Sequence, residues 1–193
     1  MTKRTLGAHL VQDWVYGWSL AGLLLIALLP LFVGNWPAAL IAVVVQLPIY
    51  MLHQFEEHAD DRFGRFVTAE IGGGREVLPA VAIFWINVPG VGGLNLVSIW
   101  LAAAVNIGFG LIGIYLVLIN AVAHIGQALA MRRYNPGLIT AVVLFLPAGL
   151  WGLWTVSTAP GVGLGFQALG LVVAIAVHGA IVGYVMANRR RMG

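Results

Sequence analysis

Long apolar runs, broken by a few short polar segments, dominate the chain and predict helices that span a membrane. Such a helix needs about 20 predominantly apolar residues to cross the hydrocarbon core. By this measure the pattern predicts six spans. Four of them have clear ends, because polar or Gly- and Pro-containing turns flank the ranges 15–33, 37–57, 138–156 and 166–187.

The central apolar stretch, 77–131, is too long for one span and suits two. Its segment 89–93 (PGVGG) favours a turn or an unwound helix, so we expect the third span to end there. The long polar stretch 58–76 precedes the third span, and Pro48 is expected to kink the second. The predicted fold is an all-α, polytopic membrane helix bundle that forms one domain over residues 1–193.

Basic residues are confined to one set of turns and to the chain ends. The turns near Asn35, Gly90 and Pro160 contain no Lys or Arg. Since Lys and Arg are enriched on the cytoplasmic side of membrane proteins, both termini are predicted to be cytoplasmic. With six spans, one side of the membrane carries all the basic residues: Lys3, Arg4, Arg62, Arg65, Arg75, Arg132, Arg133, Arg189, Arg190 and Arg191.

Composition supports a multi-pass protein of the cell membrane. Hydrophobic residues make up 61% of the chain and charged residues 9%, and the mean hydropathy is +0.95. The chain has no cysteine, which excludes Cys-bound zinc, iron–sulfur clusters and a Cys nucleophile. The net charge of +3 follows from membrane topology, so we expect membrane lipids and no nucleic acid as partners.

The densest group of ionisable residues is the segment 53–58 (HQFEEH), at the end of the predicted second span. Because ionisable groups are costly inside a membrane, such a group is a candidate functional site. His53, Glu56 and Glu57 are spaced i, i+3 and i+4, so their side chains share one side of a helix. His58 begins the polar stretch, where a solvated role is favoured over metal binding.

Polar residues on three other spans lie at a similar predicted depth. His124 precedes the next basic turn by eight residues, or roughly 12 Å, and follows Asn120 by one helical turn. His178 precedes the C-terminal arginines by eleven residues, or roughly 16 Å. Asn87 lies at a comparable depth on the third span, beside Trp85. We therefore expect one polar pocket, with His58, Asn87, Asn120 and Trp85 as supporting residues.

Imidazoles and carboxylates are the ligands of zinc, manganese and non-haem iron in proteins. We therefore predict a divalent metal ion, with zinc favoured and iron or manganese as alternatives, bound by His53, His124, His178 and one glutamate. Glu57 is assigned to the metal, and Glu56 and Glu57 are the candidate catalytic residues. Which of the two binds the metal and which acts as the general base stays open. A metal-free proton network and a purely structural hydrogen-bond network are the alternatives.

The predicted function is a membrane-embedded metal-dependent enzyme that acts on a lipid-like or isoprenoid substrate, since the site lies among acyl chains. Hydrolysis is the default reaction, and oxidation is the alternative if the metal is iron. The same Glu and His residues also suit a small proton-coupled transporter with 89–93 as its unwound helix. A non-catalytic membrane assembly factor is a third interpretation. The substrate, the metal and the oligomeric state do not follow from the sequence.

The pattern His53-x-x-Glu56-Glu57 resembles the HXXEE-domain family of bacterial integral membrane proteins. The segments 52–66 and 120–124, and 133–138 with Thr140, are also similar to this family. The resemblance implies a polytopic protein of the bacterial inner membrane, with an uncharacterised biochemical function. The layout is also similar to that of CAAX-type membrane glutamic proteases, although Arg62 lies one residue beyond their Glu-Glu-x-x-x-Arg spacing.

Overall fold

The computed structural model describes residues 5–192, and every regular element in that range is helical. This confirms the predicted all-α bundle. Lys3 and Arg4, which contributed to the predicted orientation, lie outside the described residues. Six segments are long and apolar enough to cross a membrane: Leu6–Leu31, Ala38–Glu70, Ala80–Ala104, Ile107–Met131, Leu138–Ser157 and Leu164–Met192.

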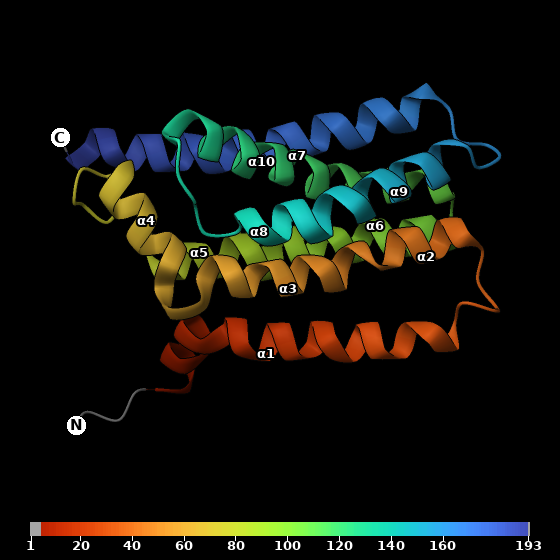
Figure 1. Cartoon of the computed structure of the whole chain (residues 1–193), viewed down its shortest axis with the longest axis horizontal. Coiled ribbons are helices and arrows are strands. Elements are labelled where there is room, and N and C mark those ends of the chain that lie inside the picture. Colours follow the sequence, from red (N-terminus) through yellow and green to blue (C-terminus); the bar gives the residue numbers. More distant parts are fainter. Residues whose placement is uncertain (1–4, 193) are drawn as a thin grey trace.

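The helices run along the long axis of the molecule (Figure 1). Short 3-10 and π-helical segments join several of them within one span. The start of α1 and the end of α10 lie at the same end of the bundle, as six spans require. The α-helices are α1 (Leu6–Leu28), α2 (Ala38–Val44), α3 (Gln46–His58), α4 (Arg62–Glu70), α5 (Ala80–Trp85), α6 (Gly93–Ala104), α7 (Leu111–Met131), α8 (Leu138–Thr140), α9 (Leu146–Ser157) and α10 (Leu164–Met192).

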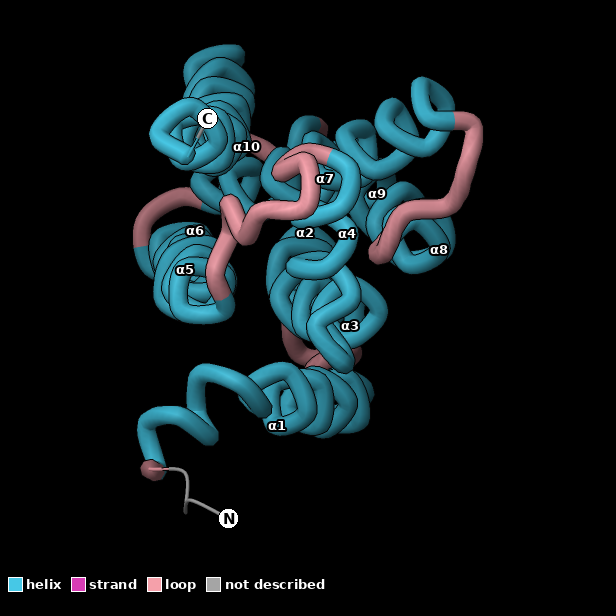
Figure 2. Tube along the Cα trace, turned by 90° about the vertical axis from the view of Figure 1, so that its left-hand side faces the viewer, coloured by secondary structure: helices cyan, strands magenta, loops and turns pink. Residues whose placement is uncertain are grey.

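Helix α7 lies at the centre of the bundle. Figure 2 shows α3, α6, α9 and α10 around it, with α1 on the outside against α3. In the most apolar 18-residue segment of each span, 61% of the residues are buried in the fourth span and 56% in the second, against 17% in the first and sixth. The second and fourth spans are therefore the ones that can hold polar side chains together away from lipid.

Pro48 interrupts the second span, as the sequence predicts. It has no N–H to bond to the carbonyl oxygen of Val44, and α2 ends at that residue before α3 begins at Gln46. The buried amide of Gln46 donates hydrogen bonds to the carbonyl oxygens of Ala42 (2.8 Å) and Ala148 (3.1 Å). The interruption therefore also links the second span to the fifth.

The predicted end of the third span at 89–93 is wrong. The chain there forms a π-helix, Ile86–Gly92, which continues from α5 into α6. Pro89 cannot donate a backbone hydrogen bond, and the wider π turn accommodates it while the helix continues through the membrane. The span ends instead before Asn106, whose Oδ1 accepts a hydrogen bond from the N–H of Gly108 (2.8 Å). An N-cap asparagine is a weaker sequence signal than a Pro-Gly cluster.

The polar stretch 58–76 contains helix α4. Asp60 and Asp61, both with left-handed backbone angles (φ 53° and 55°), form the sharp turn that precedes it. At the other end of α4 the carboxylate of Glu70 forms an ion pair with Arg133 in the loop between α7 and α8. This pairing raises the pKa of the Arg133 guanidinium. Helix α4 is thereby fixed across one end of the bundle.

The end of the bundle that carries α4 is also its basic end (Figure 1). It holds the loop before α5, the loop between α7 and α8, and the last turn of α10. The charge asymmetry seen in the sequence is therefore an asymmetry between the two ends of the folded bundle. The basic residues at this end are Arg62, Arg65, Arg75, Arg132, Arg133, Arg189, Arg190 and Arg191.

Candidate metal centre

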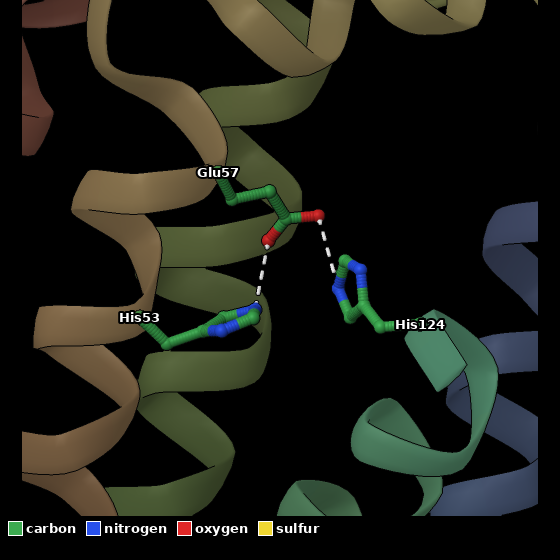
Figure 3. Close-up of side chains that lie close together, drawn as sticks. All are labelled: His53, Glu57 and His124. Carbon is green, nitrogen blue, oxygen red and sulfur yellow. Dashed lines mark ion pairs between the residues drawn. The ribbon is translucent and has the colours of Figure 1, made fainter. Parts of the chain in front are cut away.

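Three buried side chains converge near the basic end of the bundle: His53 and Glu57 from α3 and His124 from α7 (Figure 3). The carboxylate of Glu57 lies between the two imidazoles. Its Oε2 is 3.3 Å from His53 Nε2, and its Oε1 is 3.7 Å from His124 Nε2. One potential ligand atom from each residue lies within 4.8 Å of the others. This spacing fits a single divalent cation bound by two imidazoles and one carboxylate.

Helical geometry explains how the three side chains meet. His53 and Glu57 are four residues apart on α3, so they project from the same face one turn apart. His124 faces them from α7, the central helix. All three are at most 6% exposed, which removes the water that would otherwise solvate a carboxylate. A buried carboxylate needs a compensating cation, either protons on the imidazoles or a metal ion.

Asn135, in the loop between α7 and α8, fixes the tautomer of His124. The Nδ2 of Asn135 donates a hydrogen bond to the main-chain carbonyl oxygen of His124 (2.8 Å). The Oδ1 of Asn135 is therefore the atom that faces His124 Nδ1, at 2.8 Å. Because an amide oxygen only accepts, Nδ1 carries the hydrogen. The Nε2 of neutral His124 thus presents a lone pair to Glu57.

Thr140 fixes the tautomer of His53 in the same way. Its hydroxyl donates a hydrogen bond to Glu56 Oε2 (2.5 Å), so its oxygen accepts one from His53 Nδ1 (2.8 Å). The Nε2 of neutral His53 is left with a lone pair and has no hydrogen-bond partner among the described residues. Two lone pairs and a carboxylate directed at one point repel each other unless a cation lies between them. Metal-binding histidines are typically oriented by such a bond from their other ring nitrogen.

The backbone of Gly137 packs directly against both imidazoles. A Cβ atom at this position would lie 2.6 Å from His124 Cε1 and 2.8 Å from His53 Cε1. The residue also has a φ of +100°, which only glycine adopts readily. The loop between α7 and α8 can therefore close over the two rings only because residue 137 is glycine.

Glu56 faces a different set of partners from those of Glu57. Its carboxylate accepts hydrogen bonds from the N–H groups of Ile139 (3.1 Å) and Thr140 (2.7 Å), from the Thr140 hydroxyl, and from the Tyr134 hydroxyl (2.8 Å). These N–H groups belong to the first turn of α8, where the backbone donors of a helix are unpaired. Burial of Tyr134 and its bond to Glu56 raise its pKa to about 12. Glu56 thus holds the fifth span against the second and is not a residue of the cavity.

His58 and Asn87 extend the polar cluster towards the third span. The Nδ2 of Asn87 donates to the carbonyl oxygen of Ile83 (2.9 Å) and to His58 Nε2 (3.3 Å), and its Oδ1 accepts from the Tyr50 hydroxyl (2.8 Å). His58 Nε2 is also 3.4 Å from the Oε2 of Glu57. Helix α3 continues through His58 and buries it. His58 therefore lies inside the pocket and has no solvated role.

A cavity of about 250 Å³ adjoins the cluster on its Glu57 and His124 side. It lies between α3, α4, the third span, α7 and α10. Most of its lining is aliphatic or aromatic, as in typical small-molecule sites. The cluster therefore opens into an apolar chamber. The polar residues that line this chamber are Tyr50, Glu57, His58, Asn87, Asn120, His124, Gln127 and His178.

The remaining predicted site residues divide into two groups. Asn120 and His178 line the cavity, but His178 is not part of the three-residue cluster. Trp85 does not line it and is 61% exposed on the surface of the bundle. The reason is helical geometry: Trp85 precedes the inward-facing Asn87 by two residues, about 200° around a helix.

Sequence reasoning missed the residues that orient the imidazoles. The pattern predicts only a polar turn that contains Asn135 and Gly137, followed by a span that starts at residue 138 and includes Thr140. The available signal is an asparagine and a threonine around a Pro-Gly pair at a helix start. Nothing in their spacing shows that the loop folds back on His124, because that depends on how α7 and α8 pack.

The match to known families covers most of this site. Residues 44–152, more than half of the chain, match the family described as "Protein of unknown function with HXXEE motif". No curated protein and no solved structure matches the chain. The matched range contains the three cluster residues and the loop that orients them, whereas His178 lies beyond it. The chain belongs to the HXXEE-motif family, as its sequence pattern predicts.

Proposed function

We propose that this protein is a membrane-embedded, metal-dependent enzyme whose divalent cation binds to His53, Glu57 and His124. One observation carries the proposal: the two Nε2 lone pairs and the carboxylate point at one place, while a hydrogen bond fixes each Nδ1. Three protein ligands beside an open cavity are typical of catalytic rather than structural zinc sites. The same ligand set also suits non-haem iron, and manganese is a third candidate.

The proposed reaction is hydrolysis of a lipid-like or isoprenoid substrate, because the cavity beside the cluster is mainly apolar. When bound, a divalent cation supplies a Lewis acid that polarises a carbonyl group. His178 is the residue placed to accept a proton. Its Nδ1 donates to the carbonyl oxygen of Ala174 (2.8 Å), so its Nε2 is a free base at the cavity wall. Glu56 has the role of a positioning residue, since its carboxylate already accepts four hydrogen bonds.

We further infer that the basic end of the bundle faces the cytoplasm of a bacterial inner membrane. The concentration of arginines in α4, in the loop between α7 and α8, and at the end of α10 supports this orientation. The candidate site would then lie in the cytoplasmic half of the membrane, where lipid substrates made in the cytoplasm are accessible.

Elemental analysis tests the proposal directly. Protein purified in detergent without chelators or a polyhistidine tag is expected to hold about one equivalent of zinc, iron or manganese. His53→Ala, His124→Ala and Glu57→Gln are each expected to abolish it. His9→Ala is the matched control, because His9 is exposed and pairs with Asp13 (3.1 Å), away from the cluster. Metal-free wild-type protein with normal helix content, or metal retained in His124→Ala, would contradict the proposal.

A proton-handling network in a small transporter is the second candidate. The distances between Glu57 and the two imidazoles also suit ion pairs with protonated histidines. Against it, the unwound helix expected at 89–93 is a continuous π-helical segment. Metal-free but folded protein would favour this candidate, and proton-driven uptake into proteoliposomes, lost in Glu57→Gln, would then be the measurement that supports it.

A further inference from the structure

We infer that the cavity beside the cluster binds an uncharged amphiphile with a hydroxyl head group, such as a long-chain alcohol, in preference to a phosphorylated or carboxylate lipid. The inference rests on the proposed function, because a long-chain alcohol is the product that hydrolysis of its uncharged ester would release at the same site. Its grounds are the polar atoms that the protein leaves unpaired, the charges that line the cavity, and the side on which the cavity reaches the surface.

A stripe of polar residues on α7 faces the cavity. Asn120, His124 and Gln127 are spaced i, i+4 and i+7, so they share one face of the helix, and all three line the cavity. The Oδ1 of Asn120 is buried and has no hydrogen-bond partner among the described residues. A buried acceptor without a partner is unfavourable, and a small rotation of the Asn120 amide would expose it to a ligand in the cavity that donates a hydrogen bond.

His178 presents a second acceptor from α10. The carbonyl oxygen of Ala174 can only accept, so Nδ1 of His178 carries the hydrogen and Nε2 carries a lone pair. The cavity wall thus offers acceptors at Asn120 and His178, together with the amide donor of Asn120. A hydroxyl group donates one hydrogen bond and accepts others, which matches this wall. An ionised phosphate or carboxylate has only acceptors and leaves the two protein acceptors unpaired.

The charges around the cavity also disfavour an anionic head group. None of the cavity-lining residues in the described part of the chain is Lys or Arg, and Glu57 contributes a carboxylate. Proteins recognise phosphate and carboxylate groups mainly with Arg and Lys side chains. Arg133, at the same end of the bundle, is paired with Glu70 and does not line the cavity. An anionic lipid would therefore gain no cationic side chain at this wall, and any preference for it would have to come from the divalent cation proposed at the cluster.

The rest of the lining fits an alkyl or isoprenoid chain that enters from the membrane. Phe63 and Val67 of α4 and Ile181 and Val185 of α10 form part of the apolar wall. Val182 lines the cavity and is also 61% exposed on the outer surface of α10. The cavity therefore reaches the lipid-facing side of the bundle at α10, so a lipid chain can enter it sideways.

Photo-crosslinking in nanodiscs of phosphatidylcholine tests the inference. The probes are three diazirine lipids of equal chain length: a primary alcohol, an alkyl phosphate and a fatty acid. The alcohol is expected to label cavity-lining peptides of α7 and α10. Unlabelled alcohol is expected to compete at about tenfold lower concentration than the matched phosphate, the difference that one hydrogen bond can make. Equal or stronger competition by the phosphate would overturn the inference.

Two substitutions locate the head group. Asn120→Leu and His178→Phe are each expected to raise the concentration of unlabelled alcohol needed to compete with the labelled probe about three- to tenfold. Thr155→Val is the matched control, because the Thr155 hydroxyl bonds to its own helix at Trp151 (2.7 Å) and does not line the cavity. If Asn120→Leu or His178→Phe does not fold, Gln127→Leu takes its place in the test. Unchanged competition in folded variants would overturn the inference.

Metal content is measured on the same samples, with and without chelator treatment. Alcohol binding that depends on Asn120 and His178, in wild-type protein that holds no metal even without chelator treatment, would support this inference and contradict the proposed enzyme. Stoichiometric metal in a protein whose cavity prefers the phosphate would support the proposed metal site and contradict this inference. The two proposals can therefore fail separately.

Discussion

The two halves of α7 lie in different surroundings. In its first half, Leu111 and Ile114 are fully buried in an apolar cluster shared with the second, third and fifth spans. In its second half, His124 faces His53 and Glu57 beside the cavity. Since lipid supplies little hydrophobic driving force between helices, close packing in the first half is what holds the bundle together. In the second half, part of that packing is replaced by the polar cluster and the cavity beside it.

The hydrogen bonding of polar side chains also differs between the two halves. Near the first half, the hydroxyl of Tyr115 donates to Gln167 (2.8 Å), which in turn donates to Ser157 (2.6 Å). Gln46 Oε1, beside Ile114, is unpaired there, but near the second half an ionisable group, His53 Nε2, is left without a hydrogen bond within the described chain, as is Asn120 Oδ1. Unpaired buried groups are rare in native structures and mark places where a ligand or ion is expected. Substitutions in the first half should therefore change stability, and those in the second half should change metal binding.

The largest expected effect comes from the packed half. Ile114→Ala removes a fully buried side chain ten residues, or about 15 Å, before His124 on α7. The resulting cavity is expected to lower the free energy of unfolding by about 2–5 kcal/mol, with metal stoichiometry unchanged. Loss of helical circular dichroism during a denaturant titration measures the first quantity, and elemental analysis measures the second.

Val172→Ala on the lipid-facing side of α10 is the control for this substitution, since Val172 is 63% exposed. Its unfolding free energy is expected to stay within about 0.5 kcal/mol of wild type. Metal loss in folded Ile114→Ala protein would show that the two halves of α7 are not independent.

The next effect tests the loop that closes over the imidazoles. Gly137→Ala places a methyl group against both rings at a position with positive φ, so the rings must move. Metal affinity is expected to fall by about 10- to 100-fold, the range found when groups that orient metal ligands are altered. Competition with a fluorescent chelator measures this affinity.

Gly73→Ala separates backbone strain from displacement of the rings. Gly73 also has a positive φ, of +61°, but a methyl group added there would have no neighbouring atom within 4 Å. Its substitution is expected to leave metal affinity unchanged. Wild-type affinity in Gly137→Ala would contradict the geometry described for the site.

Regular helical spacing made much of this molecule predictable. The apolar runs predict the six spans, and the four-residue separation of His53 and Glu57 predicts a shared helix face. His124 could be placed near them because counting residues from a basic turn measures depth in the membrane. The spacing also left Glu56 and Glu57 equivalent. They differ by about 100° around α3, and only the packing of α8 decides which of them faces the cavity.

Contacts made by loops and irregular helices were not predictable in this way. The fold-back of Asn135 onto His124 depends on tertiary packing and has no periodic signal. The sequence of the π-helix around Pro89 also fits a turn, because the same Pro and Gly residues favour both structures. The real boundary at Asn106 has no proline and no charge, and its signal is a single capping side chain.

A smaller effect is expected from the groups that hold each Nδ1. Asn135→Leu and Thr140→Val each remove one hydrogen bond to an imidazole and leave the three proposed ligands in place. Each is expected to weaken metal binding about tenfold. Thr140→Ser retains the hydroxyl and is expected to bind metal like wild type. Equal affinities of Thr140→Val and wild type would show that the Nδ1 contact does not orient His53.

The smallest effect concerns Tyr134, whose hydroxyl donates a hydrogen bond to Glu56 (2.8 Å). Burial and the bond to Glu56 raise its pKa to about 12 in the folded protein, against about 10 in an unfolded chain. A group whose pKa is raised by folding contributes stability below its unfolded pKa and loses that contribution as the pH rises through the folded value. Wild-type stability is therefore expected to fall between about pH 10 and 12, with a weaker fall in Tyr134→Phe. The difference between the phenolate absorbance titrations of the two proteins reports Tyr134 alone, and a midpoint near the unfolded value would contradict its bond to Glu56.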